Sequence, residues 1–262
     1  MAIGSLVAVA ISRRQRAGSW LDPLRIRSGR VAVAVQVVGL VAAGTMFRTL
    51  DGPLAGLALA CTPAVALLVR ERAGRRATVA ALGSSLAAIV GLTLAVGDDG
   101  VGSVTLVGVA IAVAFVAIEV IGLRTTELAV EDGLNPTTLV SSSMITGSVI
   151  LLPMGLAFGT LREPSAIWSA LGAAFAVALF GTVGRVLRTA ALPAAGVMAV
   201  AASTQVTALV TAIGGVVLLA DPLTPVGLIA AVVAAVLGAT AVVAGARWRL
   251  ERSPGLGRAL DS

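Results

Sequence analysis

The sequence predicts an all-α, polytopic membrane protein of about nine transmembrane segments, built as two inverted repeats of a five-helix unit with the first repeat truncated. Three observations support this prediction: a low content of charged residues, a series of long uncharged runs, and two similar decapeptides 140 positions apart. The first two indicate helices in a bilayer, and the third indicates an internal duplication.

The composition does not fit a soluble globular domain. Only 12% of the 262 residues are charged and 58% are hydrophobic, and the mean hydropathy is +1.02. A soluble domain carries about 25% charged residues. The uncharged runs approach the roughly 20 residues that a helix needs to cross a bilayer, and they lack the alternation typical of a β-barrel strand. Because backbone groups in lipid must bond within their own segment, we expect helices.

Several residue types that carry chemistry in membrane enzymes are absent. The chain contains no His, no Tyr and no Lys, so all 19 basic residues are Arg. This excludes retinal-type Schiff bases, His-ligated metals and Ser/His catalytic pairs, and the single Cys61 excludes an intramolecular disulfide. We therefore predict no catalytic residue and no metal site. The isoelectric point near 11.4 is explained by arginines that flank membrane spans, not by binding of nucleic acid.

Apolar segments follow one another along the chain with short connections. They cover residues 1–12, 31–50, 53–70, 77–97, 101–123, 136–160, 166–190, 193–219 and 225–246. The first is too short to cross a bilayer, since twelve helical residues rise only about 18 Å, and we interpret it as the inner end of a span that begins upstream. Turns such as LDG at 50–52, GDDG at 97–100 and REP at 162–164 separate later segments, and residues 247–262 form a solvated cytoplasmic tail.

The placement of arginine predicts the orientation of these segments. Alternate connections hold 17 of the 19 arginines, and the opposite set holds only Arg48 and Arg162. Since cytoplasmic loops are enriched in basic residues, we predict a cytoplasmic carboxy terminus. The regular alternation also supports the number of segments, because one missed span would disturb it.

Two similar decapeptides indicate the duplication. Residues 47–56 read FRTLDGPLAG and residues 187–196 read LRTAALPAAG. In each, an arginine that can anchor a helix end precedes a proline suited to a first helical turn. Five segments separate the paired helices, and this odd number places the two copies in opposite orientations. The predicted halves are residues 1–97, which are incomplete, and residues 101–246.

The second half carries a recognisable pattern: a helix that begins at Pro193, the turn ADPLTP at 220–225, and a final helix with Gly227 and Gly238. Residues 134–153, LNPTTLVSSSMITGSVILLP, add a second similarity. In these features the chain resembles an EamA-type member of the drug/metabolite transporter superfamily, which has ten helices in two inverted repeats. With nine segments, the first helix of the first repeat is lacking. The resemblance implies transport of small molecules across a bacterial plasma membrane without a cofactor.

Polar side chains inside apolar segments are the candidate functional residues. Thr204, Thr207 and Thr211 share one helical face, and Gln205 adjoins this stripe near the middle of its predicted helix. Such a stripe either lines a substrate cavity or lets helices pack closely, and the amide of Gln205 needs a partner in either case. The other candidates for the substrate pathway are Ser142, Thr146 and Gln36.

Glu119 is the only acidic residue within a predicted span. An intramembrane carboxylate is costly, and its presence suggests a functional role such as proton coupling. Because the predicted segment ends only four residues later, an interfacial carboxylate paired with an arginine is the alternative. Arginines in reach of such a pairing are Arg124, Arg185 and Arg188.

Together, these patterns and the resemblance predict a secondary-active exporter of small metabolites that works by alternating access, with a small-molecule substrate and the lipid bilayer as partners. Inverted-repeat transporters hold substrate near the bilayer midplane. The alternative is a non-transporting helical bundle, either an accessory subunit or a degraded paralogue, which the lacking first helix favours. A membrane enzyme is disfavoured, since the sequence contains no recognisable catalytic constellation.

Overall fold

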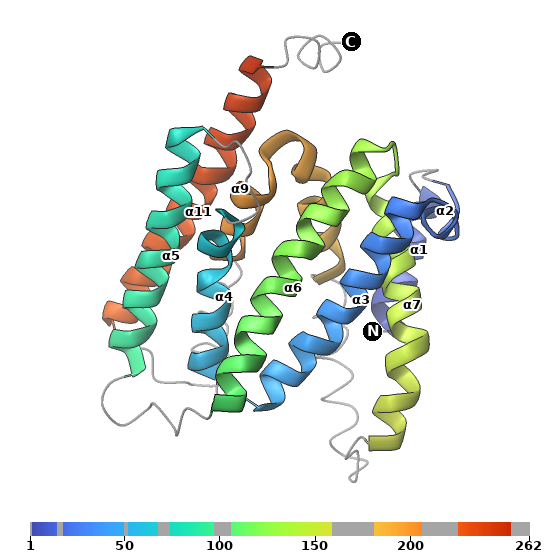
Figure 1. The fold of residues 1–262 in the computed structure, drawn as a ribbon, viewed down its shortest axis with the longest axis horizontal. Coiled ribbons are helices and arrows are strands. Elements are labelled where there is room, and N and C mark those ends of the chain that lie inside the picture. The colour runs from blue at the N-terminus through green and yellow to red at the C-terminus, as the bar shows by residue number, and fades with distance from the viewer. Residues whose placement is uncertain are drawn as a thin grey trace. The chain divides into compact units, whose positions relative to one another are not determined.

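The structure, a computed structural model, describes residues 2–14, 18–49, 52–67, 74–96, 106–158, 181–205 and 225–252. In these residues all regular secondary structure is helical (Figure 1). The helices are α1 (Ala2–Arg14), α2 (Asp22–Arg25), α3 (Arg27–Thr49), α4 (Gly52–Ala66), α5 (Arg75–Val96), α6 (Leu106–Glu131), α7 (Pro136–Phe158), α9 (Val197–Ala202) and α11 (Pro225–Arg252), with a further helix over 181–195. The predicted all-α class is confirmed for this part of the chain.

Three of the described helices are long and apolar enough to cross a membrane. The stretches concerned are Arg27–Met46 in α3, Val107–Glu131 in α6 and Leu228–Arg252 in α11. Only 28% of the stretch in α11 is buried inside the protein, so most of this apolar helix is left to contact lipid. These helices indicate a membrane protein, as the composition predicts, while the number of nine spans stays a prediction.

Two helices extend past the ends that their apolar runs predict. α11 continues to Arg252 instead of 246, and α6 continues to Glu131 instead of 123. The end of α6 is set by a Schellman motif: Gly133, with a φ of 89°, donates its N–H to the carbonyl of Val130, and Leu134 donates to that of Ala129. Arg124, Glu127 and Glu131 therefore lie on the helix and not in a loop.

The chain forms two compact units. The first unit comprises Met1–Val41 and Thr125–Ala190, and the second unit comprises Ala42–Arg124 and Ala191–Ser262. Each unit takes residues from both halves of the sequence, and α3 and α6 contribute to both. The repeat boundaries at 1–97 and 101–246 stay a prediction, since a division by contact does not test them.

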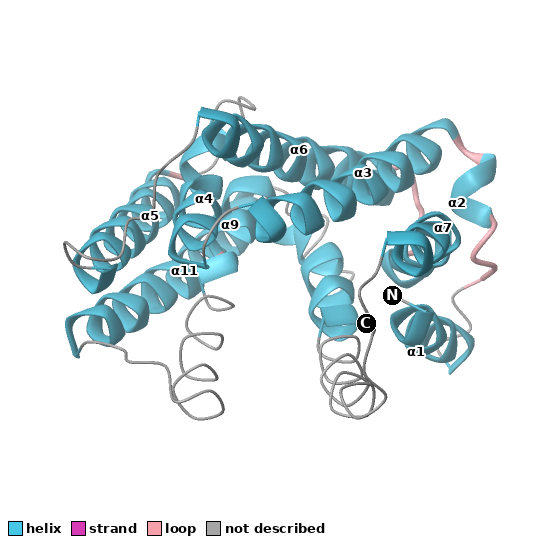
Figure 2. Ribbon diagram, turned by 90° about the horizontal axis from the view of Figure 1, so that it is seen from below, coloured by secondary structure: helices cyan, strands magenta, loops and turns pink. Residues whose placement is uncertain are grey.

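In the first unit, α1 and α7 lie side by side (Figures 1 and 2). The hydroxyl of Ser141 lies 3.0 Å from the carbonyl oxygen of Ala8 and 2.8 Å from that of Thr137, which ties α7 to α1. A small apolar core joins α3, the end of α6 and the start of α7. Its buried members are Ala32, Val33, Val37, Ala129, Leu134 and Leu139.

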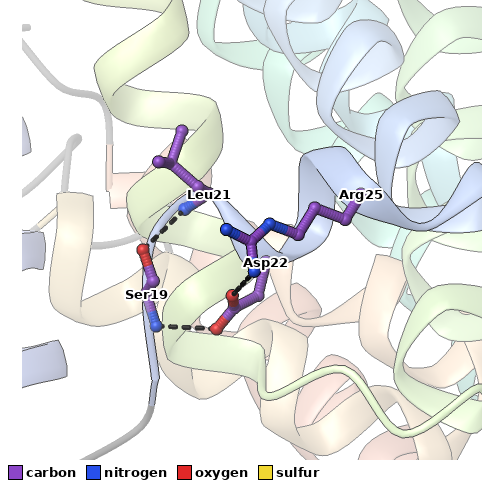
Figure 3. Close-up of polar contacts among 4 residues, drawn as sticks. All are labelled: Ser19, Leu21, Asp22 and Arg25. Atoms are coloured by element: carbon purple, nitrogen blue, oxygen red, sulfur yellow. Dashed lines mark hydrogen bonds and ion pairs between the residues drawn. The ribbon is translucent and has the colours of Figure 1, made fainter.

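The chain ahead of α3 is ordered by a polar turn (Figure 3). The backbone N–H of Ser19 donates to Oδ2 of Asp22 at 2.7 Å, and the N–H of Leu21 donates to Oγ of Ser19 at 3.2 Å. Arg25 Nη1 lies 3.8 Å from Oδ1 of Asp22, and the two side chains are 75% and 41% exposed. Exposed pairs of this kind contribute little to stability, so the turn serves mainly to satisfy backbone groups.

In the second unit, α5 and α11 lie side by side (Figures 1 and 2). α11 also packs very closely on the segment that contains α9. A Cβ atom at Gly238 would collide with the carbonyl oxygen of Ala202, and one at Gly245 would lie 2.5 Å from that of Ala195. Small residues permit this approach of two backbones, as in other membrane helix pairs.

The helix predicted over 193–219 does not begin at Pro193. Pro193 lies inside the helix over 181–195, and the break falls at Gly196, whose φ is 90°. Only glycine adopts this conformation readily. α9 then runs from Val197 to Ala202 and ends in a turn at Ser203. A helix boundary is present in this region, but the break lies at Gly196, three residues later than Pro193 suggests.

Candidate functional site

The candidate residues are divided between the two units. In the first unit are Gln36, Ser142 and Thr146, and in the second are Glu119, Thr204 and Gln205. Thr207 and Thr211 lie outside the described residues. The continuous threonine stripe therefore stays a prediction.

A side-chain hydrogen bond joins α3 to α6 in the first unit. Gln36 Nε2 donates to Oγ1 of Thr126 at 2.8 Å, and Thr126 is only 3% exposed. The neighbouring Val33 and Val37 belong to the apolar core that includes Ala129 of α6, which holds the two backbones within reach. Interhelical bonds of this kind in membranes contribute about 0.6 kcal/mol on average. Gln36 itself is half-buried, and its role as a pathway residue stays a prediction.

Glu127, next to Thr126, is the residue that sequence reasoning missed. Its side chain is fully buried in the first unit, inside the stretch of α6 that is long enough to cross a membrane. Glu119, half-buried, is therefore not the only acidic residue within this span. Burying a carboxylate costs several kcal/mol unless it is neutralised or paired. An ionisable side chain inside a span is therefore a candidate for an ion or substrate path.

The start of α7 supplies a buried row of hydroxyl groups. Ser141, Ser142 and Ser143 are all fully buried. Ser143 donates to the carbonyl of Val140 at 2.9 Å, whereas the hydroxyl of Ser142 has no hydrogen-bond partner within the described part of the chain. Thr146, one turn further along α7, is half-buried. The row gives the first unit polar groups that can both donate and accept hydrogen bonds.

In the second unit, Gln205 makes an interhelical bond. Its side chain is 2% exposed, and Nε2 donates to the carbonyl oxygen of Ala60 in α4 at 3.2 Å. The hydroxyl of Thr204 donates to Ala201 within its own segment at 2.7 Å. The amide of Gln205 thus has a hydrogen-bond partner, as predicted, and this partner is the backbone carbonyl of Ala60. A wider cavity around Thr207 and Thr211 is a separate prediction.

Two further hydroxyl groups in the second unit lack a hydrogen-bond partner among the described residues: those of Thr62 in α4 and Ser85 in α5. Both side chains are almost fully buried. Pro63, which follows Thr62, lies inside α4 and removes one backbone donor from the helix. Nothing in the sequence pattern distinguished these two residues from other small polar residues in apolar runs.

The chain matches no protein-family model and no curated protein sequence. The site must therefore be interpreted from its own chemistry. The first unit contains a buried carboxylate, a half-buried amide and several buried hydroxyls. Groups of these kinds can exchange a proton or form hydrogen bonds with a small polar molecule. In the second unit Gln205 and Arg249 bond to other segments, whereas the hydroxyls of Ser84 and Thr204 bond within their own.

Proposed function

We propose that this chain is a secondary-active transporter that exports small metabolites from a bacterial cell by alternating access. The observation that carries the proposal is the complete burial of Glu127 in an apolar helix long enough to cross a membrane. Ionisable side chains in spans are rare and mark substrate or ion paths. The resemblance of the sequence to EamA-type transporters supports the same function.

In this proposal Glu127 exchanges a proton with the side of the membrane to which the site is open. The gradient across a bacterial plasma membrane drives protons inward, so that proton entry can drive a substrate outward. The amide–hydroxyl pair of Gln36 and Thr126 offers hydrogen bonds to a polar substrate beside the carboxyl. Glu119, half-buried on the same helix, is the second carboxylate that can serve in this role.

The test is a transport assay with the full chain reconstituted into lipid vesicles. A pH gradient is imposed, and proton movement is followed with a trapped pH-sensitive dye while amino acids, nucleosides and sugars are added in turn. We expect at least one compound to dissipate the gradient. Glu127→Gln should abolish this response but retain exchange of the compound across the membrane, since exchange needs no net proton movement. Glu131→Gln, an exposed carboxylate one turn further along α6, is the matched control.

The alternative is a non-transporting helical bundle, and one observation favours it. The hydroxyl of Ser141 and the amide of Gln205 bond to backbone carbonyls of other helices, as expected of groups that hold helices together, and the hydroxyls of Ser143 and Thr204 bond to carbonyls of their own segments. If no compound crosses the membrane and Glu127→Gln simply destabilises the protein, the bundle is the better description.

A further inference from the structure

Trp248 lies at one end of the α5–α11 pair, where α5 begins and α11 ends. Gly74, just ahead of α5, packs so closely on this indole that a Cβ atom there would lie 2.6 Å from Cδ1 of the ring. The guanidinium carbon of Arg252 lies 4.7 Å from the centre of the ring, a distance typical of a cation–π contact. Arg249 Nη1 donates to the carbonyl of Pro193 at 3.0 Å. Two arginines are therefore held in place by the fold.

All charged residues of α5 and α11 lie at this end. Arg75 and Arg76 at the start of α5 are exposed, as are Arg247 and Arg252, and Glu251 is the only carboxylate among them. Residues 77–96 and 225–246 carry no charge at all. The six residues that we call the arginine–tryptophan cluster are Arg75, Arg76, Arg247, Trp248, Arg249 and Arg252.

The helix faces that lead up to the cluster are apolar and exposed. On α5 the exposed side chains include Val79 and Leu86, which are 62% and 64% exposed, and on α11 they include Val236 and Val243, at 59% and 53%. Such faces contact lipid tails in a membrane protein. The cluster therefore lies where these helices leave the hydrocarbon region, which is also the usual place for a tryptophan.

We propose that the arginine–tryptophan cluster binds the phosphate headgroups of anionic phospholipids. Guanidinium groups bind phosphate through paired hydrogen bonds, and an anionic leaflet attracts each nearby arginine by about 1 kcal/mol. Five arginines against one carboxylate give this region a net positive charge, which complements the negative charge of the headgroups. The adjoining apolar faces favour a lipid over a nucleic acid or an acidic protein, because only a lipid offers tails to cover them.

Quenching of Trp248 fluorescence by brominated lipids tests this proposal directly. The full chain, with Trp20→Phe and Trp168→Phe so that Trp248 is the only indole, is reconstituted into phosphatidylcholine vesicles that contain increasing fractions of brominated phosphatidylglycerol. We expect stronger quenching than with brominated phosphatidylcholine at equal fractions, which gives a relative affinity above one. Arg75→Gln/Arg76→Gln should lower this preference at least fivefold, the factor that corresponds to about 1 kcal/mol.

Two matched variants decide the outcome. Arg27→Gln/Arg30→Gln removes two exposed charges from the start of α3 and should leave the preference unchanged, whereas Arg247→Gln/Arg252→Gln should lower it as Arg75→Gln/Arg76→Gln does. Equal quenching by both lipids, an unchanged preference in the cluster variants, or an equal loss in the α3 variant would overturn the proposal. Relief of quenching by millimolar inorganic phosphate would instead assign the cluster to a soluble phosphate compound, which also overturns it.

Discussion

The close approach of α11 to α9 makes Gly238 the most informative position for a test of the second unit. Gly238→Ala adds one methyl group. At this position a Cβ atom collides with the carbonyl oxygen of Ala202 and lies 3.5 Å from Cβ of Gln205. Because the first contact is with backbone, no side-chain rotation can relieve it. The two segments must separate, and the bond from Gln205 to Ala60 is strained as they do.

The expected loss follows from two opposing effects. Overpacking of one methyl group costs about 1–3 kcal/mol, while replacing glycine by alanine inside a helix gains about 0.5–1 kcal/mol. The difference is a net loss of about 0–2.5 kcal/mol. Because the clash is with backbone, we expect the upper part of this range, about 1–2.5 kcal/mol, which corresponds to a fall in melting temperature of about 2–10 °C for a chain of this size. Gly44→Ala is the control, since a Cβ atom at Gly44 in α3 meets nothing within 4 Å. It should melt at the wild-type temperature or slightly above.

Cys61 provides the assay. It is the only thiol in the chain, it is half-buried, and it follows Ala60, the acceptor of the bond from Gln205. A maleimide dye that fluoresces on reaction with a thiol therefore reports the opening of this region during heating. If Gly238→Ala melts at or above the temperature of Gly44→Ala, then α11 does not approach Ala202 as closely as described, and the packing argument fails.

Two further predictions concern the first unit and the orientation of the chain. The bond between Gln36 and Thr126 should appear in a double-mutant cycle with Gln36→Leu and Thr126→Val as a coupling of about 0.6 kcal/mol, and not above about 1.7 kcal/mol; strictly additive losses of unfolding free energy would mean that the pair is not bonded in solution. A reporter that fluoresces only in the cytoplasm, fused after Ser262, should be bright because 17 of 19 arginines lie in the connections predicted to face that side, and a dark but stably inserted fusion would contradict the topology.

The existence of the helices could be predicted from the sequence, but several of their ends could not. Long uncharged runs leave helix as the only economical structure in lipid, and every described apolar run is indeed helical. At the helix boundary predicted near 193, proline suits a first helical turn, but Pro193 lies in the last turn of the helix over 181–195. Gly196 decides the break through its positive φ, yet in a chain with 30 glycines one more glycine is a weak signal.

The weakest prediction about the candidate site concerned the end of α6, and with it the position of Glu127. The segment from 101 was predicted to end at 123, just before Arg124, which placed Glu127 in the following connection. The sequence does contain the correct end signal: Gly133 occupies the position that a Schellman motif requires, and Pro136 follows shortly after. Weighing this cap above the charges would have extended the helix to Glu131.

The later end of α6 changes the functional interpretation of Glu127. With the helix end at Glu131, Glu127 moves from solvent into the interior of the first unit, next to Thr126 and its bond to Gln36. A carboxylate in a solvated loop keeps its hydration, whereas one buried in a span loses it and must be neutralised or paired. In the proposed transporter, the choice between Glu119 and Glu127 as the coupling carboxylate depends on burial: Glu119 is half-buried and Glu127 is fully buried. We accordingly expect Glu127→Gln to affect gradient-driven transport more than Glu119→Gln does.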